Sequence, residues 1–214
     1  MSRGLGDVYK RQALMIPQIV ERLSKFPVIE NCPSKNRERN SAAVLVILKD
    51  FNSEPALLLT KRSKNLRHHA GQVAFPGGMW EEDDQSLLQT AVREASEEIG
   101  LSAESIECFA MMPKASPWRR DIDVTPFISR AVEPLNLKAN VNEIEAIFDV
   151  PLQHFLDIKN YQYKSMSLLG GYRDANFQLP FIEYKGNQIW GFTLKVITDL
   201  VALISDEPLA SIWK

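Results

Sequence analysis

Cysteine and long apolar runs are both scarce in this chain of 214 residues. Its 2 cysteines, Cys32 and Cys108, are far apart, and neither belongs to a CxxC pair. A zinc knuckle or a disulfide framework is therefore not expected, and a reducing cytoplasm is the expected location. The longest apolar runs, such as residues 42–48, are far shorter than the roughly 20 residues that a membrane-spanning helix needs. We expect no association with a membrane.

The chain also lacks an excess of charge of either sign. Its 25 Lys and Arg residues nearly balance 27 Asp and Glu residues, which leaves a net charge of −2. Domains that bind nucleic acids usually carry a basic excess, so DNA and RNA are not expected partners. With 45% hydrophobic and 24% charged residues, the composition is typical of a globular protein, and the length suits one domain with a buried core.

Four segments are expected along the chain. Residues 1–12 show no apolar period and resemble translated adapter sequence, so we expect a non-native or disordered leader without the apolar stretch of a secretory signal. Residues 13–40 begin with apolar residues at helical spacing and continue as a polar linker. Residues 41–206 are expected to form the main domain, and residues 207–214 a C-terminal tail.

Strands and helices alternate in the expected domain. Short apolar runs between turn signals predict strands at residues 42–50, 55–62, 71–78, 105–112, 123–132 and 143–152. The turn at 185–187 predicts a hairpin of residues 177–184 and 188–190. Helices are predicted from Asp83 or Asp84 onward, around 152–156 and at 192–204. The pattern indicates an α+β fold, an α/β/α sandwich with a central mixed β-sheet flanked by helices.

The first of the longer predicted helices carries three glutamates close together. Like charges at Glu94, Glu97 and Glu98 repel by roughly 0.2–0.5 kcal/mol per pair at these spacings. Since each residue turns by about 100°, Glu94 and Glu98 stack beside the apolar stripe while Glu97 points further outward. Mg²⁺ and Mn²⁺ prefer carboxylate oxygens, and such an ion would cancel the repulsion. The arrangement favours a divalent metal site over a solvated acidic face.

Two further features adjoin these glutamates. Arg93 followed by Glu97 is the less favourable polarity for a helical ion pair, so we expect its guanidinium to hold a carboxylate bidentately, with a plain surface pair as the alternative. Gly77 and Gly78 precede the acidic segment, where they permit close approach of the backbone to a ligand or form an ordinary tight turn.

These residues carry a resemblance to a known family. The stretch GGMWEEDDQSLLQTAVREASEEIGL, residues 77–101, resembles the Nudix box, G-x5-E-x7-R-E-U-x-E-E-x-G-U with U aliphatic. Its second half matches at Arg93, Glu94, Glu97, Glu98, Gly100 and Leu101. Its first half departs from the pattern, because the sixth residue after Gly78 is Asp84 instead of Glu and the gap from Asp84 to Arg93 is one residue longer.

A second motif narrows the resemblance to one branch. The stretch LLLTKRSKNLRHHAGQVAFPGG, residues 57–78, is similar to LLTxRSxxLRxHxGQVAFPGG of the coenzyme A diphosphatase branch. The resemblance implies a Nudix fold and hydrolysis of coenzyme A or acyl-coenzyme A to 3′,5′-ADP and a 4′-phosphopantetheine product. Within the enzymes, the rivals are Nudix hydrolases of ADP-ribose, NADH or a dinucleoside polyphosphate. A Nudix-fold sensor that has lost catalysis is the rival from another class.

The resemblance also implies roles for individual residues. Mg²⁺ or Mn²⁺ is the expected cofactor, with Glu94, Glu97 and Glu98 as its ligands. Catalytic roles are expected for Glu97, Arg93 and Glu143, with Glu97 as a third ligand or the base that activates water. A base outside the box is the alternative, with Glu143 and Glu145 as candidates unless they simply face solvent. Substrate-binding residues are expected to be Arg62, Arg67, His69, Gln72, Gly77 and Gly78.

Other candidate contacts are less distinctive. The cations Lys61, Arg62, Lys64 and Arg67 suit the phosphates of coenzyme A, unless they lie on a solvated loop. His68 and His69 would face opposite ways on a strand, and His69 either contacts substrate or bonds to a neighbouring loop. Trp118, Trp190 and Tyr172 could stack on adenine or fill the core. The expected partner is a small nucleotide, and a homodimer stays open.

Overall fold

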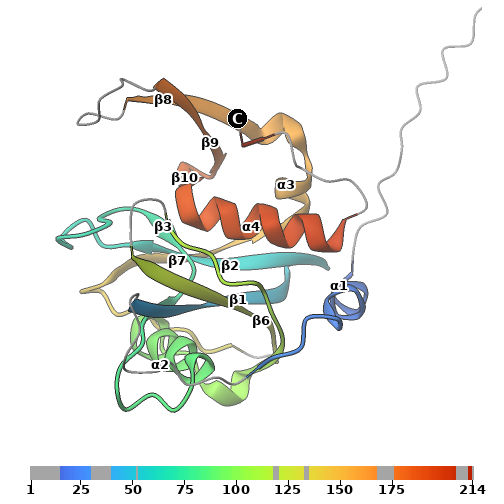
Figure 1. The fold of residues 1–214 in the computed structure, drawn as a ribbon, viewed down its shortest axis with the longest axis vertical. Helices are drawn as coiled ribbons and strands as arrows, with labels where there is room; N and C mark the ends of the chain where they lie inside the picture. Colours follow the sequence, from blue (N-terminus) through green and yellow to red (C-terminus); the bar gives the residue numbers. More distant parts are fainter. Residues whose placement is uncertain are drawn as a thin grey trace, which may run out of the picture.

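The computed structural model describes residues 15–29, 40–51, 53–117, 121–132, 135–167, 176–205 and 212–213. The expected leader at 1–12, Cys32, Trp118 and Tyr172 lie outside these ranges, as does most of the expected tail. Within them, a large mixed sheet and a smaller sheet lie on either side of one helix (Figure 1). This is the α+β sandwich that the sequence predicts, extended by a second sheet.

The described strands of the large sheet follow the order β3-β2-β1-β6-β5, with β4 paired to β1 and β7 paired to β2. Their bounds are β1 Asn40–Phe51, β2 Glu54–Arg62, β3 Val73–Ala74, β4 Gly77–Met79, β5 Ile106–Met111, β6 Ile122–Ala131 and β7 Ile144–Pro151. Only the β1–β6 pairing is parallel among these. β1 pairs with β4 near its start and with β2 near its end, so the chain around β4 lies beside the centre of the sheet.

Helices cover both faces of this sheet. Helix α2, Leu87–Ile99, packs its apolar stripe on Leu45 and Ile47 of β1, while Val46 faces the other side. Helices α1, Ile16–Leu23, and α4, Gly191–Ile204, cover that other side together with α3, Leu152–Leu156. Because both faces are buried, β1 reads as a continuous apolar run rather than an alternating one.

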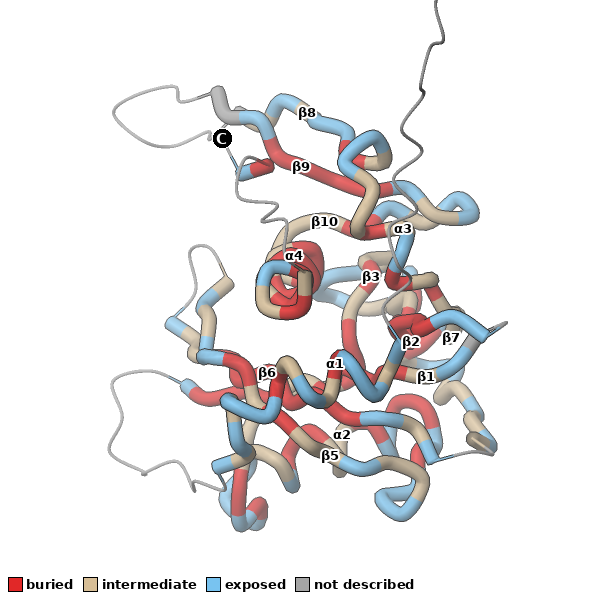
Figure 2. The backbone as a smooth tube through the Cα atoms, turned by 90° about the vertical axis from the view of Figure 1, so that its right-hand side faces the viewer, coloured by how far each residue is buried: buried red, intermediate tan, exposed pale blue. Residues whose placement is uncertain are grey.

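The smaller sheet contains β8 Tyr161–Ser167, β9 Asn176–Tyr184 and β10 Asn187–Trp190, in the order β10-β9-β8. β9 and β10 form the predicted hairpin, whose two turn residues, Lys185 and Gly186, both have positive φ as a tight hairpin turn requires. Strand β8 was not predicted. Figure 2 shows buried stretches of β9 and of the large sheet on opposite sides of α4.

One predicted strand is wrong in its extent. The third strand, expected at 71–78, is divided into β3 and β4 around Pro76, which has no backbone N–H to donate within a strand. The carbonyl of Pro76 instead accepts a hydrogen bond from the N–H of Leu45 at 2.8 Å. Gly77 and Gly78 therefore lie in β4 opposite Val44 and Ala43, and not in a tight turn.

Candidate active site

Helix α2 begins later than the predicted Asp83 or Asp84. Ser86 has extended backbone and its side chain accepts a hydrogen bond from the N–H of Gln89 at 3.2 Å, which makes Ser86 the N-cap. The helix ends at Gly100, whose φ of 65° is left-handed, as is common for a residue that terminates a helix. The two ends place Glu94, Glu97 and Glu98 in the second half of α2.

The three glutamates differ in burial as the helical spacing predicts. The side chain of Glu98 is 3% exposed, that of Glu94 is 18% exposed, and that of Glu97 is 57% exposed. The Oε2 of Glu98 accepts a hydrogen bond from the N–H of Gly77 at 3.2 Å, and its Oε1 accepts one from Nη1 of Arg62 at 3.2 Å. Glu98 is thus a buried carboxylate held from two sides.

Burial and neighbouring acids make the charges in this cluster costly. Burial raises the pKa of Glu98 to about 7, and the negative charges of Glu94 and Glu143 add to this rise. The hydrogen bond from Gly77 and the charge of Arg62 oppose it. Burial also raises the pKa of Glu94, against the charge of Arg93. A cation near Glu94 and Glu98 would stabilise their ionised forms.

Strand β4 leaves room for Glu94 because it has no side chain at Gly78. A Cβ atom at Gly78 would lie 2.3 Å from Cδ of Glu94, and a Cβ at Gly77 would lie 2.3 Å from the carbonyl oxygen of Ala43. Both distances are far shorter than any contact between non-bonded atoms. The two glycines therefore allow the backbone of β4 to pack directly against the carboxylate on one side and β1 on the other.

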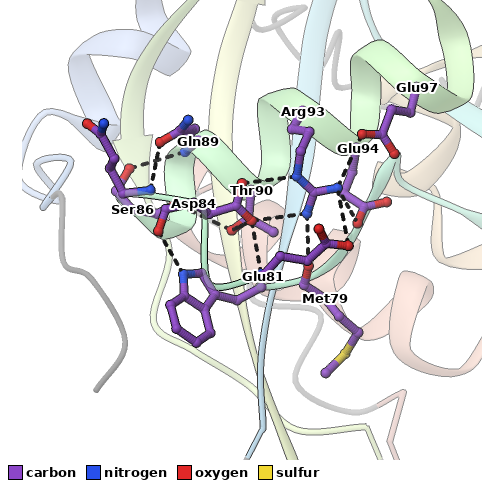
Figure 3. A network of polar contacts seen from close by, with 11 residues as sticks. Met79, Glu81, Asp84, Ser86, Gln89, Thr90, Arg93, Glu94 and Glu97 are labelled. Carbon is purple, nitrogen blue, oxygen red and sulfur yellow. Dashed lines mark hydrogen bonds and ion pairs between the residues drawn. The ribbon is translucent and has the colours of Figure 1, made fainter. Parts of the chain in front are cut away.

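Arg93 holds a carboxylate bidentately, and that carboxylate belongs to Asp84 (Figure 3). Its Nε and Nη2 donate to Oδ1 and Oδ2 of Asp84, each at 3.0 Å. Nη1 donates to Glu94 at 3.1 Å and to Glu97 at 3.4 Å, so Arg93 connects Asp84 to two glutamates of the cluster. The hydrogen bond to Asp84 is the main cause of a raised pKa for Arg93.

Asp84 is a site residue that the sequence-based prediction missed. Its side chain is 2% exposed, and Oδ2 also accepts hydrogen bonds from the Thr90 hydroxyl at 2.9 Å and from the N–H of Glu81 at 3.1 Å. Burial alone would raise the pKa of Asp84, but Arg93, Glu81 and Thr90 together hold it below its ordinary value. Asp84 is the sixth residue after Gly78, the position where the box pattern has Glu, so counting from Gly78 provides the signal that identifies it.

The two acids proposed outside the box have different surroundings. Glu145 is exposed and pairs with Lys61, whose Nζ lies 2.9 Å from its Oε1, and this pair lowers the pKa of Glu145. Glu143 is close enough to Glu98 to raise its pKa, and it accepts a hydrogen bond from Nδ2 of Asn140 at 3.4 Å. Of the two, Glu143 is the one that adjoins the carboxylate cluster.

The loop between β2 and β3 folds back on itself. Gly71 donates its N–H to the carbonyl of Arg62 at 3.1 Å, and Arg62 donates to the carbonyl of Gln72 at 2.9 Å. His69 has a φ of 57°, and its Nδ1 lies 2.7 Å from Oε1 of Gln72. The strand geometry considered for His68 and His69 is therefore wrong, because both lie in this loop. The hydrogen bond of His69 is made to Gln72 of the same loop and not to a neighbouring loop. Arg67 is exposed on the same loop.

Three aromatic residues were considered for stacking on adenine, and Trp190 is the one that the structure describes. It lies at the end of β10. The Nζ of Lys164 sits 4.0 Å from the centroid of its ring, and the pKa of Lys164 is lowered by burial. Trp190 therefore already has a cation on its ring.

A divalent ion fits this cluster by its chemistry. Among the described residues, no three His, Cys, Asp or Glu side chains form a ready-made metal site, and Arg62 and Arg93 bind oxygens of Glu98 and Glu94. The carboxylates of Glu94 and Glu98, whose pKa values are both raised by burial, are nevertheless of the kind that Mg²⁺ and Mn²⁺ prefer as ligands. None of the described helices is long and apolar enough to cross a lipid bilayer.

Comparisons with known proteins identify the family. A family model described as the NUDIX domain matches residues 39–168. The Nudix hydrolase NudL of Photorhabdus laumondii is 33% identical over 196 residues, which cover 92% of this chain and 95% of that protein. NudL of Citrobacter koseri is 34% identical over 190 residues, covering 87% and 94%. Among solved structures, the Nudix hydrolase RenU from M. smegmatis aligns with a TM-score of 0.46 and 24% identity, over 60% of this chain and 80% of that one.

The match to the family model spans more than half of the chain, and the NudL relatives exceed 30% identity over most of it. The mixed sheet with helices on both faces is the Nudix fold that the resemblance implied. This chain belongs to the Nudix family and is a hydrolase that acts on pyrophosphate bonds.

Proposed function

We propose that this enzyme hydrolyses the diphosphate bond of coenzyme A and acyl-coenzyme A, which yields 3′,5′-ADP and (acyl-)4′-phosphopantetheine. One observation carries the proposal: two residues of the segment that resembles the coenzyme A branch, Arg62 and Gly77, contact Glu98. Arg62 donates to its Oε1 and Gly77 donates to its Oε2. The residues that distinguish the branch therefore adjoin the carboxylates that the whole family shares.

In this proposal Glu94 and Glu98 hold Mg²⁺ or Mn²⁺, with Glu97 as a further ligand or as the base. A bound divalent ion supplies neutralisation of the diphosphate and a lower pKa for the attacking water. Arg93 positions Glu94 by linking it to the buried Asp84. Glu143 is the alternative base, because it adjoins Glu98 whereas Glu145 is paired with Lys61.

The loop after β2 is the proposed site for the phosphates and the pantetheine arm. Lys64 and Arg67 are exposed there and can form charge-assisted hydrogen bonds with phosphate oxygens. His69 and Gln72 hold each other, which we propose shapes the loop for the substrate. We assign residues 41–206 to the catalytic domain and propose a cytoplasmic enzyme whose partner is a small nucleotide.

The experiment that tests the substrate is a comparison of products by mass spectrometry. Coenzyme A, ADP-ribose, NADH and a dinucleoside polyphosphate are offered separately, with Mg²⁺, with Mn²⁺ and with a chelator. We expect 3′,5′-ADP from coenzyme A in the presence of metal. Preferred cleavage of ADP-ribose would contradict the coenzyme A assignment, and absence of any cleavage would favour the ligand-sensing alternative.

The metal role of Glu98 predicts a large loss of activity on Glu98→Gln, because an amide cannot replace a buried anionic ligand. We expect turnover to fall by at least about 100-fold, in the range found when a transition-state charge loses one stabilising group. The matched control is Glu104→Gln, which neutralises an exposed glutamate in the turn after α2 and should leave turnover unchanged. Folding is checked by thermal unfolding, and near wild-type turnover of the folded variant at saturating Mg²⁺ would refute the role.

A further inference from the structure

Arg62 faces helix α2 at the end of β2. Along this strand Leu58 lies in the buried cluster on the α2 side, whereas Leu59 lies in the cluster on the other side of the sheet. Because side chains alternate along a strand, Arg62 faces the α2 side and Lys61 the opposite side. The two neighbouring cations therefore pair with different acids, Lys61 with Glu145 and Arg62 with Glu98.

The guanidinium of Arg62 is held much less completely than that of Arg93. Arg93 uses all three nitrogens on described partners, including the bidentate pair with Asp84. Arg62 makes one hydrogen bond of 3.2 Å to Glu98, and among the described residues its enclosed Nε has no partner. An enclosed donor without a partner costs free energy. The hydrogen bonds of the Arg62 side chain therefore stabilise its position beside Glu98 only weakly.

The backbone of Arg62 is held by hydrogen bonds independently of its side chain. Its N–H and carbonyl are both bonded to the end of the loop, to Gln72 and Gly71. A change in the guanidinium therefore needs rotation of side-chain torsions alone. The acids around it supply the reason for its present position, because Glu98 lies near both Glu94 and Glu143 and has Arg62 as its described cationic partner.

We propose that Arg62 is an exchangeable cation: it occupies Oε1 of Glu98 when no divalent ion is bound, and gives up that oxygen when an ion binds. This inference rests on the proposed metal role of Glu98. The exchange has two consequences. Glu98 has a cationic partner in both states, and the released guanidinium becomes available to a phosphate oxygen of the substrate.

The test compares metal affinity without reference to catalysis. Mn²⁺ is titrated calorimetrically into the wild type, Arg62→Gln, Arg62→Lys and the control Lys61→Gln. Lys61→Gln removes the same charge from the neighbouring residue, which contacts Glu145 and not Glu98. If Arg62 competes with the ion, Arg62→Gln should bind Mn²⁺ about tenfold more tightly, since the ion no longer displaces a charged hydrogen bond. Arg62→Lys should lie between, and Lys61→Gln should match the wild type.

The unfolding temperatures of the same variants, with and without metal, provide a second test. Without metal, Arg62→Gln should unfold at a lower temperature than Lys61→Gln, because Glu98 then has no cation. With saturating Mn²⁺ the two variants should unfold at similar temperatures. Equal Mn²⁺ affinity in the wild type and Arg62→Gln would overturn the proposal, and so would equal tightening in Lys61→Gln, which would show a general effect of charge.

A measurement on the unaltered protein keeps the proposal testable if the variants do not fold. Mg²⁺ should shift the ¹⁵Nε signal of Arg62, while that of Arg93, held by Asp84, stays in place. An unchanged Arg62 signal at saturating Mg²⁺ would overturn the exchange. Two other results would contradict the proposed function instead. One is metal binding that Glu98→Gln does not weaken, and the other is preferred cleavage of another substrate while the Arg62 variants behave as expected.

Discussion

Glu98 combines a carboxylate with almost complete removal from solvent, so its protonation should respond to both pH and bound metal. Its side chain is 3% exposed and its charged form depends on one backbone N–H and one guanidinium. A buried acid with two further acids nearby gains a great deal from a bound cation. Metal binding and the protonation of Glu98 should therefore compete, so that affinity for Mg²⁺ weakens as the pH falls.

The raised pKa of Glu98 predicts how the stability of the metal-free protein depends on pH. The ordinary value is 4.5 and the folded value is about 7. Between these values the folded state keeps a proton that the unfolded state has lost, so the free energy of unfolding should decrease as the pH rises through this window. The decrease is on the order of 3 kcal/mol, since one pKa unit corresponds to about 1.4 kcal/mol.

Urea unfolding in a chelator, at about pH 5 and about pH 8, measures this effect. The control is Glu98→Gln, which has no proton to release, so the difference between the two pH values should be smaller in the variant by the contribution of Glu98. Identical pH dependence in the wild type and the variant would show that Glu98 titrates normally.

At the scale of elements, β4 and α2 act as one unit that holds the carboxylates. The backbone of β4 donates to Glu98 through Gly77 and lies against Glu94 at Gly78. The turn that follows β4 is tied to α2 by Asp84, which accepts hydrogen bonds from Glu81 before the helix and from Thr90 and Arg93 within it. The position of Glu94 therefore depends on both elements.

The two glycines of β4 should respond differently to alanine. At Gly77 a Cβ meets the backbone of Ala43 and the φ of 149° disfavours a side chain, so Gly77→Ala should mainly lower the unfolding temperature. At Gly78 the Cβ meets the carboxylate of Glu94, which can rotate away. Gly78→Ala should therefore lower Mn²⁺ affinity and turnover by about tenfold or more, with a smaller change in unfolding temperature. Similar effects of both substitutions on stability and activity would contradict this distinction.

Asp84→Ala should destabilise the protein by about 3 kcal/mol, because it leaves Arg93 without its main partner inside a largely buried network. The matched control is Ser86→Ala, which removes the N-cap two residues later and should cost about 1 kcal/mol. Urea unfolding gives both values. If Asp84→Ala costs no more than Ser86→Ala, Asp84 does not anchor the turn to the helix as its contacts indicate.

The same elements show what sequence periodicity can and cannot predict. The apolar stripe of α2 predicts the helix and the relative burial of its glutamates, because a 3.6-residue period determines which side chains share a face. The start of the helix was predicted wrongly, because Asp84 and Ser86 are both good capping residues. In the structure the side chain of Asp84 binds Arg93, and the side chain of Ser86 caps the helix. Strand β8, with its largely polar sequence YQYKSMS, has no apolar run that would predict it.

At the scale of the whole molecule, the described chain is an α/β/α sandwich, and the candidate active site lies where α2 meets the end of β2 and β4. The predicted architecture is confirmed because long apolar strands and amphipathic helices determine layers directly. Contacts between distant residues, such as Arg62 with Glu98, depend on how α2 packs on the sheet, which local pattern does not reveal.

Helix α4 belongs to the apolar core of both sheets. Its Ile197 and Val201 lie in one buried cluster with Val46 of β1 and Ile182 of β9. Neither sheet can separate from α4 without exposing apolar surface of the other, so the two sheets should open to solvent as one cooperative unit. Backbone amides in β1 and β9 should consequently lose protection against hydrogen exchange together, although the two strands share no hydrogen bond.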